Sequence, residues 1–196
     1  MKITADSSAL LVIDMQNGFV EEGAALRVPA AKATVPAIDA LVQRARKAGV
    51  KIIWVIREYA ADGSDVEWPR RKDLENRGLL GVMAPGTTGI NSPEIVTGLD
   101  PKDEDITIVK PRFSSFLKTD LDNILKTAGI GTVIITGTAT PNCIRATAFD
   151  AISYDYAAIV AEDCCSSKTD EIQRTNMKDM ANIGCDIVNS NDILFE

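Results

Sequence analysis

Three residues with complementary chemistry stand at or just after the end of an apolar run: Asp14, Lys110 and Cys143. A cysteine thiolate is a strong nucleophile, and a helix N-terminus or a nearby lysine lowers the pKa of the thiol. A carboxylate can take the thiol proton and later return it to a leaving amine, while the lysine ammonium holds both charges in place. These residue types predict attack of Cys143 on a carbonyl carbon, with Asp14 as the base.

Each of the three residues also has an ordinary structural explanation. Asp14 could be a turn or cap residue, Lys110 could lie on the surface before a proline, and Cys143 could be a buried helix residue. For any one of them alone the structural explanation is favoured. The catalytic interpretation depends on the three lying together, beside free backbone N–H groups that the loop 137–142 delivers to the following helix.

The chain contains no histidine. A Ser-His-Asp triad, a Cys-His pair and a histidine-rich zinc or iron site are therefore excluded. Acid–base chemistry near neutral pH must come from Asp, Glu, Lys, Cys or Tyr side chains whose pKa values are shifted. We expect no metal and no cofactor. The cysteines have no Cys-x-x-Cys spacing and are predicted to be free thiols, with Cys164 and Cys185 buried as small apolar residues.

The composition is that of a globular protein with an acidic balance: 21 basic and 28 acidic residues give a net charge of −7. This balance argues against nucleic acid as a partner, because binding to phosphates needs a basic surface. The apolar runs are much shorter than the roughly 20 residues that cross a bilayer, and the N-terminus lacks the pattern of a signal peptide. We therefore expect a cytoplasmic protein that contacts no membrane.

Apolar runs and helical patterns alternate along the chain. Helical patterns occur at 30–48, 121–128, 143–152 and 167–183. Most of the predicted strands are continuous apolar runs, as in sheets covered on both faces; they are 9–14, 50–56, 105–110, 132–137, 157–163 and 185–190. The alternation predicts an α/β fold with a six-stranded, mostly parallel sheet. Ligands bind such sheets at the carboxyl ends of the strands, where the three reactive residues stand.

The segment 57–100 interrupts this alternation. It contains six glycines and three prolines, and this density of helix and strand breakers predicts a long, mostly irregular insert. Connections of this length inside a compact domain are often functional, for example by covering a pocket. No linker divides the chain, so residues 1–196 are predicted to form a single domain whose insert covers the active site.

Three motifs carry a family resemblance: ALLVIDMQNGF at 9–19, IVKPRFSSF at 108–116 and GTATPNCIRATAFDA at 137–151. In their combination and order they resemble the isochorismatase-like cysteine hydrolases, and the resemblance covers essentially the whole chain. That superfamily includes nicotinamidase, N-carbamoylsarcosine amidohydrolase, ureidoacrylate amidohydrolase and biuret hydrolase. The resemblance implies a three-layer α/β/α sandwich of Rossmann-like type and assembly into homodimers or homotetramers.

The same resemblance implies an Asp-Lys-Cys catalytic triad, which maps onto Asp14, Lys110 and Cys143. It implies a cis peptide bond between Thr138 and Ala139, and an oxyanion hole formed by the backbone N–H groups of Ala139 and Cys143. The implied reaction is attack on a carbonyl group, release of ammonia or an amine, and hydrolysis of a thioester.

The chain also departs from the family pattern. Nicotinamidases carry an Asp-x-His and a further histidine for a metal after the second strand, where this chain has Arg57-Glu58-Tyr59. The metal-dependent nicotinamidase interpretation is therefore disfavoured. Gln173 stands where members often have a histidine. True isochorismatases cleave a vinyl ether and several lack the cysteine, so Cys143 favours amide or ureide chemistry.

Four residues are predicted to contact the substrate. By resemblance, the aromatic Phe19 lines the pocket. Arg112 and Phe113 belong to a run similar to that of ureidoacrylate hydrolases, and Arg112 could hold a substrate carboxylate or form a surface salt bridge. Trp68 could wall the site from the insert, or pack the insert or a subunit interface.

These observations leave three hypotheses for the function. The first is a metal-free amidohydrolase that acts on a small amide, ureide or carbamoyl compound. The second is a non-hydrolytic member of the fold that binds a ligand or partner and uses Cys143 as a redox or structural thiol. The third is a vinyl-ether hydrolase for a chorismate-like acid.

Overall fold

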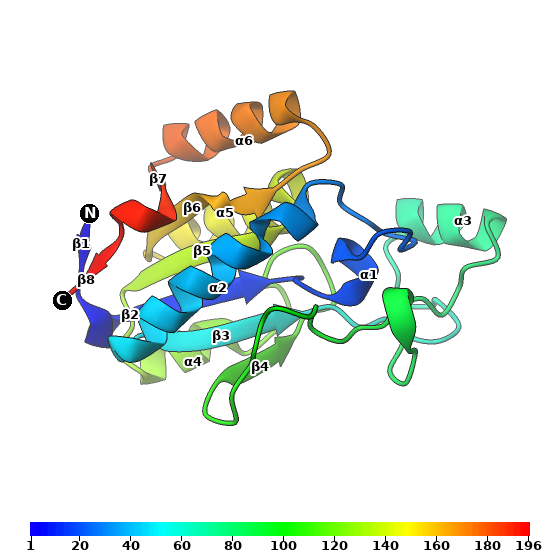
Figure 1. Ribbon diagram of the computed structural model, residues 1–196, viewed down its shortest axis with the longest axis horizontal. Helices are drawn as coiled ribbons and strands as arrows, with labels where there is room; N and C mark the ends of the chain where they lie inside the picture. Colours follow the sequence, from blue (N-terminus) through cyan, green and yellow to red (C-terminus); the bar gives the residue numbers. More distant parts are fainter.

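The computed structural model describes residues 1–196 and is built around one sheet of six strands, all of them parallel. The strand order is β4-β3-β2-β5-β6-β7 (Figure 1). The strands are β2 (Ser8–Ile13), β3 (Lys51–Ile56), β4 (Ile106–Val109), β5 (Thr132–Thr138), β6 (Ala157–Ser166) and β7 (Asp186–Val188). The predicted α/β class and six-stranded sheet are therefore confirmed.

Helices cover both faces of the sheet, because successive side chains of each strand point to opposite faces. On one face Leu10 and Val12 pack with Ile38 of α2 (Ala31–Lys47). On the other face Leu11 and Ile13 pack with apolar residues of three further helices. These are α4 (Leu121–Thr127), α5 (Arg145–Ser153) and α6 (Asp170–Asn182). The predicted three-layer α/β/α sandwich is thus confirmed, with α2 in front of the sheet in Figure 1.

Several elements differ from the predicted ones. Strand β6 continues through Cys164 and Cys165 to Ser166, beyond the predicted end at residue 163. The helix expected from residue 143 instead begins as a π-helical turn, Thr140–Ile144, and α5 starts only at Arg145. Two short strands at the chain ends, β1 (Lys2–Ile3) and β8 (Leu194–Phe195), pair in parallel and were not predicted.

The insert 57–100 is less irregular than predicted. It contains the nine-residue helix α3 (Trp68–Asn76) and a short 3-10 turn at Gly89–Asn91, and the four-residue helix α1 (Asn17–Val20) packs against that turn. Pro69 stands in the first turn of α3, where proline is favoured. The helix buries only Leu74, so it lacks the apolar periodicity that sequence analysis depends on. No helix of the protein combines the length and the apolar character needed to cross a membrane.

Gly137 lies where β5 passes closest to β2. Its φ is +111°, and a Cβ atom placed there would stand 2.0 Å from the carbonyl oxygen of Ile13. We therefore expect Gly137→Ala to lower the free energy of unfolding by at least about 3 kcal/mol, since both the backbone conformation and the contact are unfavourable. Urea unfolding measures this loss.

Gly49 provides the matched control for this substitution. It also has a positive φ, +86°, but an added Cβ atom would meet nothing within 4 Å. Gly49→Ala is expected to cost only about 1 kcal/mol. Equal losses for the two variants would contradict a specific role for the close approach at Gly137.

Candidate active site

Three strand ends bring the predicted catalytic residues together. Asp14 directly follows β2, Lys110 directly follows β4, and Cys143 lies in the π-helical turn after β5. Because all strands are parallel, these ends lie at one edge of the sheet. The side chains are buried, with relative exposures of 1% for Asp14, 0% for Lys110 and 5% for Cys143. Asp14 itself adopts a φ of 54°, a left-handed conformation that aspartate tolerates better than most residues.

The ammonium group of Lys110 connects the other two residues. Its Nζ atom donates to Asp14 Oδ2 at 2.9 Å and to the carbonyl oxygen of Arg112 at 3.1 Å, and lies 3.4 Å from Cys143 Sγ. The three protons of the ammonium group thus have three partners. Asp14 Oδ1 accepts no hydrogen bond from a nitrogen or oxygen donor. This oxygen is free to take a proton from the thiol.

Burial raises the pKa of Cys143 to about 11, and the negative charge of Asp14 acts in the same direction. The positive charges of Lys110 and Arg57 offset only part of this effect. The lysine lowers the pKa of this thiol as expected, but burial and the charge of Asp14 outweigh that effect, so the net shift is upward. The sulfur is buried beside a carboxylate and stands in a π-helical turn. Cys143 is therefore a neutral thiol at neutral pH.

The loop before Cys143 is anchored by strand β6. Thr140 Oγ1 donates to the carbonyl oxygen of Ser166 at 3.0 Å, and Ser166 Oγ donates to Thr138 Oγ1 at 2.9 Å. The peptide bond between Thr138 and Ala139 is cis. The extension of β6 to Ser166, which sequence analysis missed, thus fixes the position of the loop that carries Cys143.

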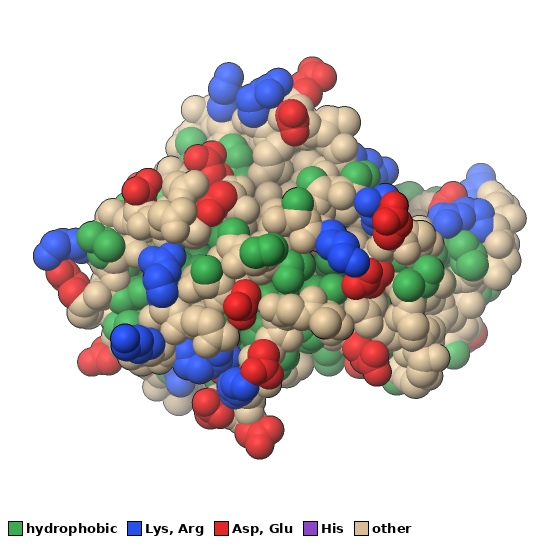
Figure 2. Space-filling model, in the orientation of Figure 1, with side chains coloured by type: hydrophobic (Ala, Val, Ile, Leu, Met, Phe, Trp, Pro, Cys, Tyr) green, Lys and Arg blue, Asp and Glu red, His purple; other side chains and the backbone are tan.

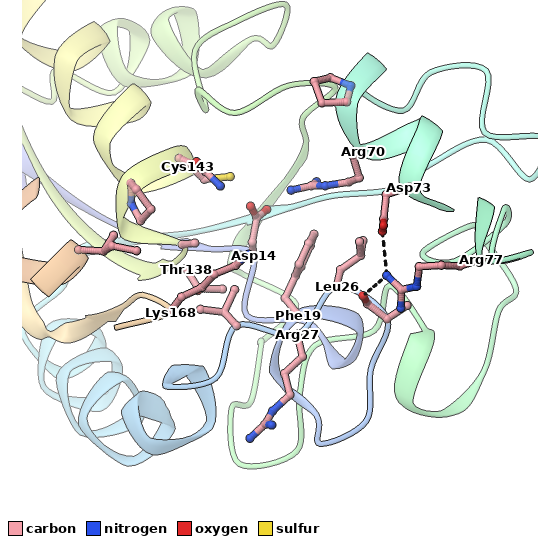
Figure 3. Close-up of a pocket in the computed structure, with 17 residues that line it drawn as sticks. Asp14, Phe19, Leu26, Arg27, Arg70, Asp73, Arg77, Thr138, Cys143 and Lys168 are labelled. Atoms are coloured by element: carbon pink, nitrogen blue, oxygen red, sulfur yellow. Dashed lines mark hydrogen bonds and ion pairs between the residues drawn. The ribbon is translucent and has the colours of Figure 1, made fainter. Parts of the chain in front are cut away.

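A cavity of about 560 Å³ opens onto these residues (Figure 3). Its wall combines the sheet edge, the loop of residues 25–28, helix α3 of the insert and the start of α6. The cavity is lined by Asp14, Phe19, Ala25, Leu26, Arg27, Val28, Pro69, Arg70, Asp73, Arg77, Thr138, Ala139, Pro141, Asn142, Cys143, Lys168 and Ile172. Asp14, Ala139 and Cys143 therefore line one cavity, and the last two are the residues of the predicted oxyanion hole. Lys110 does not line the cavity but contacts Asp14 and Cys143.

Comparison with known proteins identifies the family. The Isochorismatase domain matches residues 8–192. The protein belongs to the isochorismatase family. A probable inactive nicotinamidase of Arabidopsis thaliana is 44% identical over 180 residues, which cover 91% of this chain and 90% of that one. A ureidoacrylate amidohydrolase of Methylorubrum extorquens is 33% identical, over 81% of this chain and 69% of that one.

Solved structures support the same assignment. The crystal structure of an isochorismatase family protein from Desulfovibrio vulgaris superposes with a TM-score of 0.88. The two sequences are 40% identical, and the match covers 94% of this chain and 95% of that one. The similarity therefore extends over nearly the whole of both chains.

Of the four predicted substrate contacts, only Phe19 lines the cavity. Trp68 is 75% exposed, because it lies on the side of α3 opposite to Arg70. Arg112 turns its guanidinium to the backbone carbonyl groups of Asp65 and Pro111, at 2.8 and 2.6 Å. Phe113 packs near the guanidinium groups of two arginines instead. Trp68, Arg112 and Phe113 therefore do not line this cavity, and their contacts with a substrate stay predictions.

A buried arginine next to the family's reactive residues was not predicted. Arg57 follows β3, is fully buried, forms an ion pair with Glu67 and donates through Nη1 to the Arg112 carbonyl oxygen at 2.8 Å. The same carbonyl oxygen accepts a hydrogen bond from Lys110. The side chain of Gln16 holds the backbone of Arg57 through two hydrogen bonds of 2.8 Å. The position of Arg57 directly after strand β3 was the one feature of the sequence that could have indicated its place near the site.

The position of Arg57 also indicates whether this chain could hold a metal ion where nicotinamidases of this family do. The residues that follow β3 include this buried cation and no histidine. No group of three or more His, Cys, Asp or Glu side chains is arranged to hold a metal ion. The donor set after β3 does not fit a metal ion, because a buried guanidinium repels a cation and donates no electron pair.

All four cysteines are buried free thiols whose pKa values are raised, chiefly by burial. The value is about 11 for Cys143 and Cys185 and about 12 for Cys164. In the unfolded chain these thiols ionise near pH 8.5. Their contribution to stability is therefore fully present below about pH 8.5, falls progressively as the pH rises above that value, and is gone once the pH has passed the folded values.

We expect the free energy of unfolding to fall by about 3 kcal/mol or more between pH 8 and pH 10, from urea unfolding at each pH. Cys164→Ala removes one raised thiol and is expected to reduce that fall by about 1–2 kcal/mol. An unchanged pH dependence in Cys164→Ala would show that the buried thiols do not cause the loss of stability.

Proposed function

We propose that this protein is a cysteine hydrolase that cleaves the C–N bond of a small amide, ureide or carbamoyl compound. The observation that carries the proposal is the position of the Lys110 ammonium group, within reach of both Asp14 and Cys143 at the wall of one cavity. A ureide substrate class is supported by the 33% identical ureidoacrylate amidohydrolase.

In the first half of the proposed reaction, Cys143 Sγ forms a bond to the carbonyl carbon while its proton passes to Asp14. The carbonyl oxygen becomes an oxyanion, which the backbone N–H groups of Ala139 and Cys143 stabilise. Collapse of this intermediate breaks the C–N bond. The leaving nitrogen takes the proton from Asp14 and departs as ammonia or an amine, and a thioester remains on Cys143.

In the second half, water attacks the thioester carbon and gives a proton to Asp14. The C–S bond then breaks, the acid product leaves, and the sulfur recovers the proton held by Asp14. The ammonium group of Lys110 holds Asp14 in place and stabilises the sulfur whenever the sulfur is anionic. The neutral resting thiol fits this cycle, since Asp14 is needed as a base in both halves.

The second candidate function is ligand binding without hydrolysis. It is favoured by the 44% identical relative, which is described as a probable inactive nicotinamidase. In this case the cavity would hold a small molecule, and Cys143 would be a structural or redox thiol. The two candidates predict different fates for a bound amide, and this difference can be measured directly.

The test is ammonia release from a panel of small amides and ureides, with the quenched protein analysed by mass spectrometry. We expect ammonia from at least one compound and an acyl adduct on the peptide that contains Cys143. A compound that binds in calorimetry but is neither cleaved nor attached to Cys143 would favour the ligand-binding candidate. Absence of both binding and cleavage across the panel would contradict the proposed substrate class.

A further inference from the structure

The cavity carries an excess of positive charge, although the chain as a whole has a net charge of −7. Four basic residues line it, Arg27, Arg70, Arg77 and Lys168, against only two acidic residues. Both acids are already paired, Asp14 with Lys110 and Asp73 with Arg77. Over the face shown in Figure 2, by contrast, basic and acidic side chains are interspersed. Arg27, Arg70 and Lys168 are left without a carboxylate among the lining residues.

Of the two arginines among these three residues, Arg70 is the one directed toward Cys143 and Asp14. Figure 3 shows its guanidinium reaching from α3 into the cavity, toward the side that holds Cys143 and Asp14. In the same view the Arg27 side chain extends away from Cys143. The Arg70 side chain is only 22% exposed, so it is mostly shielded from solvent. A charge in this position acts on whatever occupies the cavity more strongly than a fully exposed one would.

The position of Arg70 is fixed by its neighbours. Nη1 donates to the hydroxyl oxygen of Tyr59 and lies 3.5 Å from Glu67 Oε2. The guanidinium carbon is 5.9 Å from the ring centroids of both Phe19 and Phe113. These contacts hold the guanidinium close to two aromatic rings, so little conformational freedom is left to lose when a ligand binds.

Some hydrogen-bond donors of Arg70 have no acceptor within the chain, and its positive charge is only partly neutralised. Nε and Nη2 make no hydrogen bond within the chain, since all of its hydrogen bonds are made by Nη1. Glu67 is its nearest carboxylate, and Glu67 also forms the ion pair with the buried Arg57. One negative charge thus faces two guanidinium groups. The missing partner is a second anion that can accept two parallel hydrogen bonds, and a carboxylate has this geometry.

We infer that the substrate carries a carboxylate group, which binds to Arg70 while its amide or ureide group faces Cys143. This inference rests on the proposed function and names the substrate class more closely, as a small carboxylic acid with an amide or ureide at its other end. The apolar residues Phe19, Leu26 and Val28 line the same cavity and fit a short carbon chain between the two groups. Arg70 is therefore the specificity-determining residue, in the role that the sequence suggested for Arg112.

Charge-matched alkylating reagents test this inference without knowledge of the substrate. Iodoacetate and iodoacetamide react with a thiol in the same way, but only iodoacetate carries a carboxylate. We expect the ratio of the iodoacetate rate to the iodoacetamide rate at Cys143 to exceed that of glutathione by about tenfold, which corresponds to one charge-assisted contact. Arg70→Gln should bring the ratio to within about threefold of that of glutathione.

Arg71→Gln provides the matched control. Arg71 is the next residue of α3, is paired with Glu75 and does not line the cavity. In Arg71→Gln, the ratio of the iodoacetate rate to the iodoacetamide rate at Cys143 should equal that of the native protein. An unchanged ratio in Arg70→Gln would overturn the inference while leaving a reactive Cys143, and hence the proposed hydrolase, intact.

Glutarate is a dicarboxylate with no amide to cleave. Its binding therefore tests the carboxylate site independently of the proposed hydrolase activity. In calorimetry, Arg70→Gln is expected to weaken glutarate binding at least tenfold, and Arg71→Gln is expected to leave it unchanged. If this result were obtained and no amide or ureide were ever cleaved, the carboxylate site would stand and the proposed hydrolase would fail. Glutarate binding that is equal in native protein and Arg70→Gln would overturn the carboxylate site.

Discussion

Replacement of Cys143 by alanine is expected to lower kcat at least about 10⁴-fold for every amide or ureide that the native protein cleaves. Alanine removes the sulfur that forms the thioester and leaves the ion pair between Asp14 and Lys110 in place. The cavity lining contains no second cysteine and no serine, and its one hydroxyl residue, Thr138, accepts a hydrogen bond from Ser166. Ammonia release under saturating substrate measures the change.

Two controls separate loss of chemistry from loss of structure. Cys185→Ala removes a buried thiol that does not line the cavity, and kcat should remain within about twofold of the native value. Cys143→Ala should still bind glutarate in calorimetry, because its cavity keeps Arg70. If Cys143→Ala kept more than a tenth of the native kcat, Cys143 would not be the nucleophile.

Much of the sheet could be predicted from sequence because its strands are buried on both faces. Leu10, Leu11 and Val12 follow one another in β2 and pack on alternate sides, so the run is apolar throughout. The reactive residues could be predicted for a related reason. Asp14 and Lys110 each follow such a run directly, and parallel strands place their carboxyl ends at one edge.

The substrate side of the cavity could not be predicted in the same way. Helix α3 buries a single residue, Leu74, and is otherwise stabilised by charged pairs such as Arg71–Glu75. No periodic apolar signal therefore marks the helix, and nothing in the sequence shows which of its charged residues faces inward. Arg70 and Trp68 are two positions apart in the chain, yet one lines the cavity and the other is exposed.

The pKa of Cys143 shows a different limit of sequence reasoning. A lysine and the start of a helix are both recognisable in sequence, and both lower the pKa of a thiol. The opposing effect, removal of the sulfur from water, depends on how completely the loop 137–142 and the insert enclose it. Burial dominates here. In the proposed reaction Asp14 is therefore a necessary base rather than an aid to a thiolate that already exists.

Replacement of Lys110 by methionine is expected to lower both activity and stability. Methionine keeps most of the length of the side chain but removes the charge, so the buried carboxylate of Asp14 loses its ion-pair partner. An unpaired buried charge costs about 3–5 kcal/mol, and the free energy of unfolding should fall by that amount in urea titrations. We expect kcat to fall at least about 10³-fold, because the oriented base and the cation beside the sulfur are both disturbed.

The double variant Asp14→Asn with Lys110→Met tests the cause of this loss. It removes both charges, so it should be more stable than Lys110→Met alone by about 1–3 kcal/mol, although it remains inactive. Lys126→Met is the control, because Lys126 forms an exposed ion pair with Asp122. It should lower the free energy of unfolding by less than about 1 kcal/mol. A double variant no more stable than Lys110→Met would mean that packing of the lysine, rather than its charge, supports the site. In that case Asp14 would be held in place without an ion pair, and the role of Lys110 would be confined to the sulfur.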